Sequence, residues 1–279
     1  MSISDKKIDT NMIANVKFCH EIVDLLFNGK REVFKIARKT NDVIALPKNQ
    51  MLASCFGKKC LILYDQDIKQ IRVISSINGK EFDPIKATCN FEEKKLYIVD
   101  FENDKVLMTD LEFNLIKSFG SSGSEDNQIQ APFDLCLINN NLYLSDTGNK
   151  RIKIFSTDLE LLNSLKVNFE PLQIKGLNSI FAVQTEPQIY FYKLSDLSFI
   201  RQYDNNFSVI SSINSNIYGL NCTTKKLYCY DDKANLIEET TFDYEYLIDG
   251  LDGRLVILNG ELFMYSDTKN SIIKFSKQL

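Results

Sequence analysis

The sequence predicts an all-β fold: a six-bladed β-propeller of four-stranded blades with a short N-terminal helical segment. Two observations carry this prediction, a short apolar motif that recurs six times and a polar turn that follows every copy at a similar distance. The motif reads MLASCF, KLYIVD, NLYLSD, SIFAVQ, NIYGLN and RLVILN, and its matching residues are Leu52, Leu96, Leu142, Ile180, Ile217 and Leu255. Six copies of one unit favour a closed ring over two stacked sandwich domains.

Each unit contains four strand-like segments. The recurring motif reads as the second strand, and a short apolar segment before it, such as DVIAL or DLCLI, reads as the first. The polar turn after the motif separates the third and fourth strands, as in IFSTDLELLN, and is rich in Asp and Asn because these residues tolerate turn geometry. In a closed ring each blade is covered by its neighbours, and most sheet edges are removed.

The first forty residues do not fit the repeat. Apolar residues near helical spacing predict a short amphipathic helix, and they are Ile13, Val16, Ile22, Val23 and Leu26. The segment REVFKIA that follows reads as a strand. We therefore expect residues 1–40 to form an N-terminal segment that closes or caps the ring, and residues 41–279 to form the propeller.

Composition places the chain among globular proteins. It has 279 residues, 44% of them hydrophobic and 25% charged, and its formal net charge of -4 gives no overall attraction to nucleic acid. We find no signal peptide and no apolar run of the roughly 20 residues that a membrane span needs. Seven cysteines without paired metal-site spacing indicate free thiols in a reducing compartment, so we expect a cytoplasmic location.

One unit resembles a known family. The segment SFGSSGSEDNQIQAPFDLCLINNNLYLSDTGNKRIKIFS contains Phe119, Gly120, Gly123 and Pro132, then Asp146-Thr147-Gly148-Asn149 before a basic residue and Arg-Ile. In this order the residues resemble an NHL repeat. The resemblance implies a six-bladed binding module like the C-terminal domain of tripartite-motif (TRIM-NHL) proteins, and so a role in recruiting ubiquitin-ligase substrates. No zinc module accompanies it, so ligase activity is not implied.

The tripeptide Asp146-Thr147-Gly148 also matches the signature of a retroviral-type aspartic protease. Corresponding places in other units read DFEN, QTEP and NCTT, so the tripeptide is one version of a recurring turn. We expect Asp146 to make a turn hydrogen bond or an ion pair with Arg151, and Gly148 to supply a positive φ.

Little in the sequence points to catalysis. The single histidine, His20, lies outside the repeats, which counts against a zinc lyase and against a Ser-His-Asp arrangement in the ring. A calcium-dependent hydrolase with acids in the central channel stays open as an alternative. We expect a non-catalytic protein with no cofactor and no bound metal.

The predicted function is recognition of a protein partner through one loop face. Loops between second and third strands emerge on the same side of a propeller, and here they carry basic and aromatic residues: Phe56, Lys58, Lys59, Phe101, Lys105, Asn149, Lys150, Arg151, Lys225 and Lys226. Single-stranded RNA is the alternative ligand, because lysines attract phosphates and exposed rings stack on bases. The lysines can also be explained without a ligand, as solvated residues that flank strands. Glu102, Asp104 and Glu186 favour this explanation, because they reduce the positive charge of the loop face.

Overall fold

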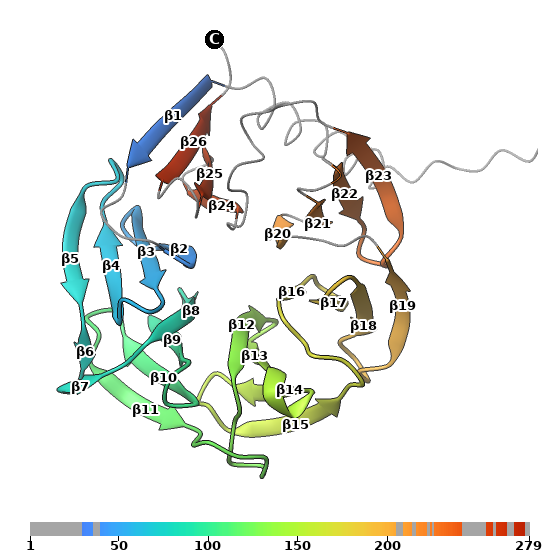
Figure 1. Ribbon diagram of the computed structural model, residues 1–279, viewed down its shortest axis with the longest axis horizontal. Coiled ribbons are helices and arrows are strands. Elements are labelled where there is room, and N and C mark those ends of the chain that lie inside the picture. The colour runs from blue at the N-terminus through green and yellow to red at the C-terminus, as the bar shows by residue number, and fades with distance from the viewer. Residues whose placement is uncertain are drawn as a thin grey trace, which may run out of the picture.

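The computed structural model describes residues 30–35, 40–204, 209–213, 216–221, 224, 226–241, 255–258, 261–266 and 271–276. Its strands form antiparallel sheets arranged around a central axis, so the chain is an all-β propeller (Figure 1). Within these ranges the helical structure is one 3₁₀ turn, η1 (Thr147–Asn149). No helix in the described ranges is long and apolar enough to cross a membrane.

Five blades are each built from four consecutive strands, numbered outward from the axis. Blade A contains β2 (Asp42–Leu46), β3 (Gln50–Cys55), β4 (Cys60–Tyr64) and β5 (Gln70–Ile74). Blade B contains β8 (Pro84–Asn90), β9 (Lys95–Asp100), β10 (Lys105–Asp110) and β11 (Leu115–Phe119). Blade C contains β12 (Pro132–Ile138), β13 (Asn141–Asp146), β14 (Arg151–Ser156) and β15 (Leu161–Lys166).

The other two blades follow in chain order. Blade D contains β16 (Ile174–Gly176), β17 (Ile180–Gln184), β18 (Ile189–Lys193) and β19 (Phe199–Tyr203). Blade E contains β20 (Val209–Ile213), β21 (Asn216–Asn221), β22 (Lys226–Tyr230) and β23 (Leu236–Thr241). A small hairpin of β6 (Ser76–Ile77) and β7 (Lys80–Glu81) lies in the connection between blades A and B.

The prediction of six equal blades with an N-terminal helix has to be corrected. The structure shows five blades of four consecutive strands, and the remaining sheet is not a further unit of that kind. It joins β24 (Leu255–Leu258), β25 (Glu261–Ser266) and β26 (Ser271–Ser276) to β1 (Lys30–Lys35), which comes from the other end of the chain. Strand β1 pairs antiparallel with β26, and Lys30 lies opposite Ser276.

This sheet explains why the last repeat was misread. The sequence analysis placed Leu255 in a second strand, but the residue lies in β24, the first of the three C-terminal strands. The last unit has no fourth strand of its own. Strand β1 takes that place, and it overlaps the segment REVFKIA that was expected to be a strand in the part of the chain closing or capping the ring. The segment expected to be helical, residues 13–26, lies outside the described residues.

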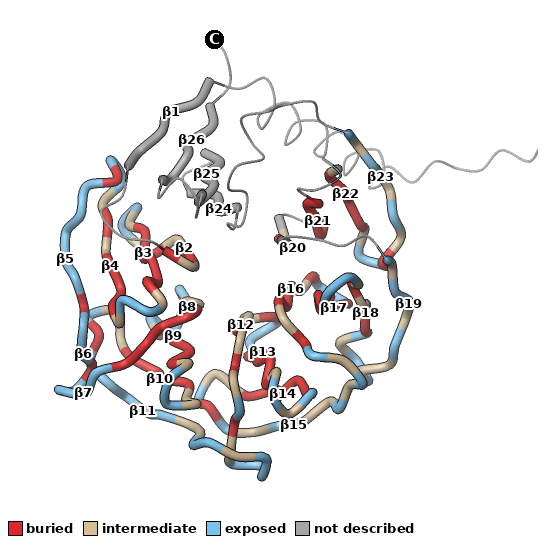
Figure 2. The backbone as a smooth tube through the Cα atoms, in the orientation of Figure 1, coloured by how far each residue is buried: buried red, intermediate tan, exposed pale blue. Residues whose placement is uncertain are grey.

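Apolar side chains pack between neighbouring blades. The cluster joining blades B and C includes Tyr97 and Val99 of β9 and Leu142, Leu144 and Phe155 of blade C, all fully buried. Each such side chain contributes about 1.5 to 3 kcal/mol through its removal from water. Burial falls from the inner strands to the outer ones, which face solvent at the rim (Figure 2). The second strand of each of the five blades is buried over almost its whole length, which is why the repeat was visible in the sequence.

Antiparallel pairing fixes where the loops emerge. Loops between the second and third strands, and the connections between blades, lie on one face of the ring, which we call the loop face. Loops between the first and second strands, and between the third and fourth, lie on the other side, which we call the opposite face. Candidate ligand-binding residues can thus be assigned to one face or the other from the strand order.

Candidate functional site

Asp146 is a structural residue at the loop face. Its carboxylate is fully buried and accepts hydrogen bonds from the Gln130 backbone N–H at 2.7 Å, from Arg151 Nε at 2.6 Å and from Asn149 Nδ2 at 2.9 Å. The ion pair with Arg151 that the sequence predicts is confirmed. A buried carboxylate held by three donors does not face a second catalytic acid, so the protease interpretation is wrong.

The same turn recurs in blade B, as the alignment of the units predicts. Asp100 accepts a hydrogen bond from the Asp83 backbone N–H at 3.0 Å and another from Asn103 Nδ2 at 2.7 Å. In both blades, the Asp at the end of the second strand therefore accepts hydrogen bonds from the loop that follows it and from the connection to the preceding blade.

The predicted role of Gly148 is wrong. The positive φ in this turn belongs to Lys150, at 50°, while Gly148 lies inside η1. Glycine is needed for space instead, because a Cβ atom there would lie 2.8 Å from Cγ of Gln130 and 3.0 Å from its carbonyl oxygen. The Gly148 N–H also donates to that carbonyl at 2.9 Å, which brings the two backbones together.

Arg151 and Lys153 fasten the connection between blades B and C. The Arg151 guanidinium donates to the carbonyls of Ser124, Glu125 and Gln128 at 2.8 to 3.0 Å. Lys153 is fully buried and its Nζ donates to a further carbonyl in the same connection, that of Asp126, at 2.6 Å. Burial lowers the pKa of Lys153, and the charge of Arg151 lowers it further. Arg151, predicted on the binding face, is thus enclosed in the fold.

Two other predicted lysines are engaged in ion pairs. Lys59 contacts Glu102 of the next blade, Nζ to Oε2 at 2.7 Å, and Lys226 pairs with Glu239. Each carboxylate raises the pKa of its lysine. These contacts neutralise much of the charge that favoured RNA.

The remaining predicted residues divide into three groups. Lys58 and Lys150 are exposed and form no ion pair within the described part of the chain. Lys105 is half-buried, and Asn149 is occupied by Asp146 and by the Gly123 carbonyl. Lys225 lies outside the described residues.

Phe56 and Phe101 form an aromatic contact across the boundary of blades A and B. Their ring centroids are 5.2 Å apart and the rings are nearly perpendicular, at 82°. Both side chains are half-buried, so part of each ring faces solvent. We call these rings, with the surrounding Lys58, Lys59 and Glu102, the loop-face patch.

Charged residues of the innermost strands pair around the axis. Lys86 Nζ lies 3.6 Å from an Asp42 carboxylate oxygen, and Lys175 Nζ lies 3.0 Å from that of Asp134. All four side chains are buried. No group of three or more His, Cys, Asp or Glu residues suited to a metal is found within the described ranges, and His20 lies outside them. Of the cysteines in the described ranges, Cys55, Cys60 and Cys229 are buried, and Cys89 and Cys136 are half-buried.

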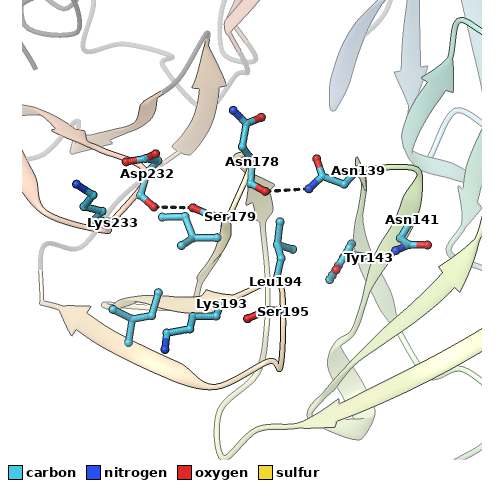
Figure 3. Close-up of a pocket in the computed structure, with 12 residues that line it drawn as sticks. Asn139, Asn141, Tyr143, Asn178, Ser179, Lys193, Leu194, Ser195, Asp232 and Lys233 are labelled. Carbon is cyan, nitrogen blue, oxygen red and sulfur yellow. Dashed lines mark hydrogen bonds between the residues drawn. The ribbon is translucent and has the colours of Figure 1, made fainter. Parts of the chain in front are cut away.

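A groove on the opposite face was missed by the sequence analysis. It has a cavity volume of about 670 Å³ and lies where blades C, D and E meet, lined by Asn139, Asn141, Tyr143, Asn178, Ser179, Ile180, Lys193, Leu194, Ser195, Ile200, Asp232 and Lys233 (Figure 3). Two hydrogen bonds fix its walls: Asn139 Nδ2 donates to the Asn178 carbonyl at 2.9 Å, and Ser179 Oγ donates to the Asp232 carbonyl at 2.9 Å.

Comparisons with known proteins show the fold. No protein-family profile matches the chain, so the resemblance to NHL repeats is not confirmed, and no curated protein matches its sequence. Among solved structures, a streptogramin B lyase is 11% identical, with a TM-score of 0.60, covering 89% of this chain and 98% of that one.

Two further structures are similar. A catalytically inactive histidine-to-alanine variant of virginiamycin B lyase from Staphylococcus aureus, solved with quinupristin, is 8% identical with a TM-score of 0.68, covering 89% of this chain and 99% of that one. The β-propeller domain of Cps50 (Swd1) from Myceliophteria thermophila is 12% identical with a TM-score of 0.59, covering 86% and 84%. At these identities the likeness establishes a β-propeller and leaves the activity open.

Proposed function

We propose that the protein is a non-catalytic recognition propeller that binds a protein partner through the loop-face patch. The observation that carries this proposal is the Phe56–Phe101 contact, an apolar centre bordered by the Lys59–Glu102 ion pair and by exposed Lys58. Protein interfaces commonly combine aromatic anchors with a polar rim of both charges. The NHL resemblance makes a ubiquitin-ligase substrate one class of partner for this surface.

RNA binding is the weaker alternative. Phosphate recognition depends on lysines and arginines that are free to contact the backbone. Here Lys59 and Lys226 are paired with carboxylates, and Arg151 is enclosed, so two exposed lysines of the predicted set remain in the described residues. Base stacking is also limited, because each phenylalanine of the patch already packs against the other.

Lyase activity is not part of the proposal. One neighbouring lyase is inactive when a histidine is replaced by alanine. This chain has one histidine, His20, which precedes the first described strand. The likeness to the lyases therefore supports the ring architecture and no residue-by-residue assignment.

A charge-reversal variant tests the proposal. We would replace by Glu both Lys58 of the patch and Lys150, the other exposed lysine on the same face. Lys48→Glu with Lys94→Glu, in exposed loops of the opposite face, is the control of equal charge change. Immobilised protein captures partners from extract, and a labelled single-stranded RNA pool is titrated in parallel at low and high salt. We expect the loop-face variant alone to lose its captured protein. Equal capture by both variants would overturn the protein proposal, and salt-dependent RNA binding lost only in the loop-face variant would replace it with the RNA alternative.

A further inference from the structure

The groove on the opposite face lies at a boundary that lacks a contact present at the preceding one. At the boundary of blades B and C, Lys95 Nζ contacts the Asp158 carboxylate at 2.7 Å, and the Tyr97 hydroxyl donates to the Thr157 carbonyl at 2.7 Å. Lys95 and Tyr97 are the first and third residues of β9, while Thr157 and Asp158 directly follow β14. These bonds close the space between the two blades.

The equivalent residues at the boundary of blades C and D cannot close it. The first and third residues of β13 are Asn141 and Tyr143, and the two residues after β18 are Leu194 and Ser195. Asparagine and serine are short and uncharged, and neither side chain forms a hydrogen bond within the described part of the chain. The Lys–Asp pair of the preceding boundary is thus replaced by two polar side chains that border an open groove.

The Tyr143 hydroxyl is a further feature of the groove that suits a ligand. It is 3% exposed, yet its hydroxyl has no hydrogen-bond partner among the described residues, whereas that of Tyr97 has one. The hydroxyl oxygen is not one of the enclosed side-chain atoms that lack a partner in the described residues, so it reaches the groove, where it can donate or accept a hydrogen bond. Since Tyr143 lines the groove, a bound molecule can supply that partner.

The rest of the lining defines the ligand chemistry. Ile180, Leu194 and Ile200 provide aliphatic surface, and Ile200 is left without a cross-strand partner by the register shift in β19. Lys193 and Lys233 outnumber the acid Asp232, so the groove carries an excess of positive charge.

We propose that the groove binds an extended peptide segment in which an apolar side chain lies next to an acidic one. The carboxamides of Asn141 and Asn178 can each donate to and accept from a peptide backbone, while the aliphatic wall takes the apolar side chain and the lysines take the carboxylate. A saccharide fits less well, because the one aromatic ring in the lining, Tyr143, is buried and offers no face for stacking. This site is separate from the loop-face patch, so the propeller can hold two partners, one on each face.

Two variants test the site without disturbing the fold. Asn141→Lys combined with Ser195→Asp copies the Lys95–Asp158 pair and should close the groove. Tyr143→Phe removes only the hydroxyl without a partner. The matched control is Tyr97→Phe, which removes a satisfied hydroxyl at the neighbouring boundary. Thermal unfolding of each variant accompanies the binding measurements.

The probes are an array of synthetic decapeptides with Leu or Ile beside Glu at varied positions, the same peptides with Lys in place of Glu, and a glycan array. We expect wild type to bind the acidic peptides, the double variant to lose at least about tenfold in affinity, and Tyr143→Phe to lose about fivefold without a fall in melting temperature. Tyr97→Phe should bind like wild type but melt at a lower temperature.

Three results would overturn the inference. The first is equal binding of the acidic peptides and of the same peptides with Lys. The second is unchanged peptide binding by the double variant when its melting temperature is normal. The third is binding of glycans in place of peptides. Lys58→Glu, on the loop face, should bind the peptides normally. Failure of the loop-face proposal therefore leaves this result unaffected, and the two proposals can fail separately.

Discussion

Replacing Arg151 by Ala is expected to destabilise the protein by about 3 to 5 kcal/mol. The change removes one partner of a buried ion pair and leaves the Asp146 carboxylate enclosed without its countercharge, a loss that falls in this range. Three backbone carbonyls of the connection between blades B and C lose their donor at the same time. This range applies to the network as a whole, because residues of one network do not contribute additively to the free energy of unfolding.

Arg151→Lys should cost less, about 1 to 3 kcal/mol. A lysine keeps the charge opposite Asp146 but cannot reach three carbonyls with the planar fork of the guanidinium. Arg201→Ala is the control, because Arg201 is exposed on an outer strand, and it should change stability by less than about 0.5 kcal/mol.

Urea unfolding followed by circular dichroism measures these differences, which suits a chain without tryptophan. A second assay follows cleavage after Glu125 by a glutamate-specific protease, since the Arg151 guanidinium holds the carbonyl of that residue. Cleavage should accelerate in Arg151→Ala and stay slow in the control. A loss below about 1 kcal/mol together with unchanged cleavage would refute the structural role assigned to this network.

Three further predictions follow from backbone space and from burial. Gly120→Ala should lower stability by at least about 2 kcal/mol, measured by urea unfolding, because φ is +104° and the new Cβ would lie 2.6 Å from the Asp104 carbonyl; wild-type stability would contradict this. Burial raises the pKa of Tyr97 and of Tyr192 to about 12. Above about pH 10 these tyrosines lose their protons in the unfolded chain before they do so in the folded protein, so the free energy of unfolding should fall as pH rises. A urea midpoint that stays constant from about pH 9 to 11 would contradict this. Burial raises the pKa of Cys89 to about 11, so alkylation of this thiol at about pH 8, followed by mass spectrometry, should be far slower in the folded protein than in urea; equal rates would refute the assignment.

The ring of four-stranded units could be predicted because burial repeats with the sequence. Leu96 and Leu142 occupy equivalent buried positions in β9 and β13, and apolar residues recur wherever the second strand lies between neighbours. The last unit broke this rule, since its sheet takes β1 from the N-terminal region. That strand leaves no signal in the last unit itself, although the segment REVFKIA reads as a strand in the sequence.

The loop face was predicted only in part. Arg151 follows a turn and is the first residue of its strand, as Lys105 is, and the sequence alone does not say which side chain points inward. The direction depends on the longer connection between blades B and C, whose carbonyls the guanidinium binds. The pairing of Lys59 with Glu102 likewise depends on the contact of two blades.

The groove could not be found from any motif. Its lining includes Asn141 and Ser195, which are far apart in the sequence and come together only when blades C and D pack. A signal was present in the repeat, where Lys95 and Asp158 occupy the equivalent positions one boundary earlier.

Quantitative capture of partners by three forms of the protein tests the central claim most directly. The forms are wild type, the Lys58→Glu and Lys150→Glu variant, and the Asn141→Lys and Ser195→Asp variant. If the propeller recognises partners on both faces, each variant should lose a different set of the proteins that wild type retains. Capture of the same proteins in the same amounts by all three forms would contradict both binding surfaces.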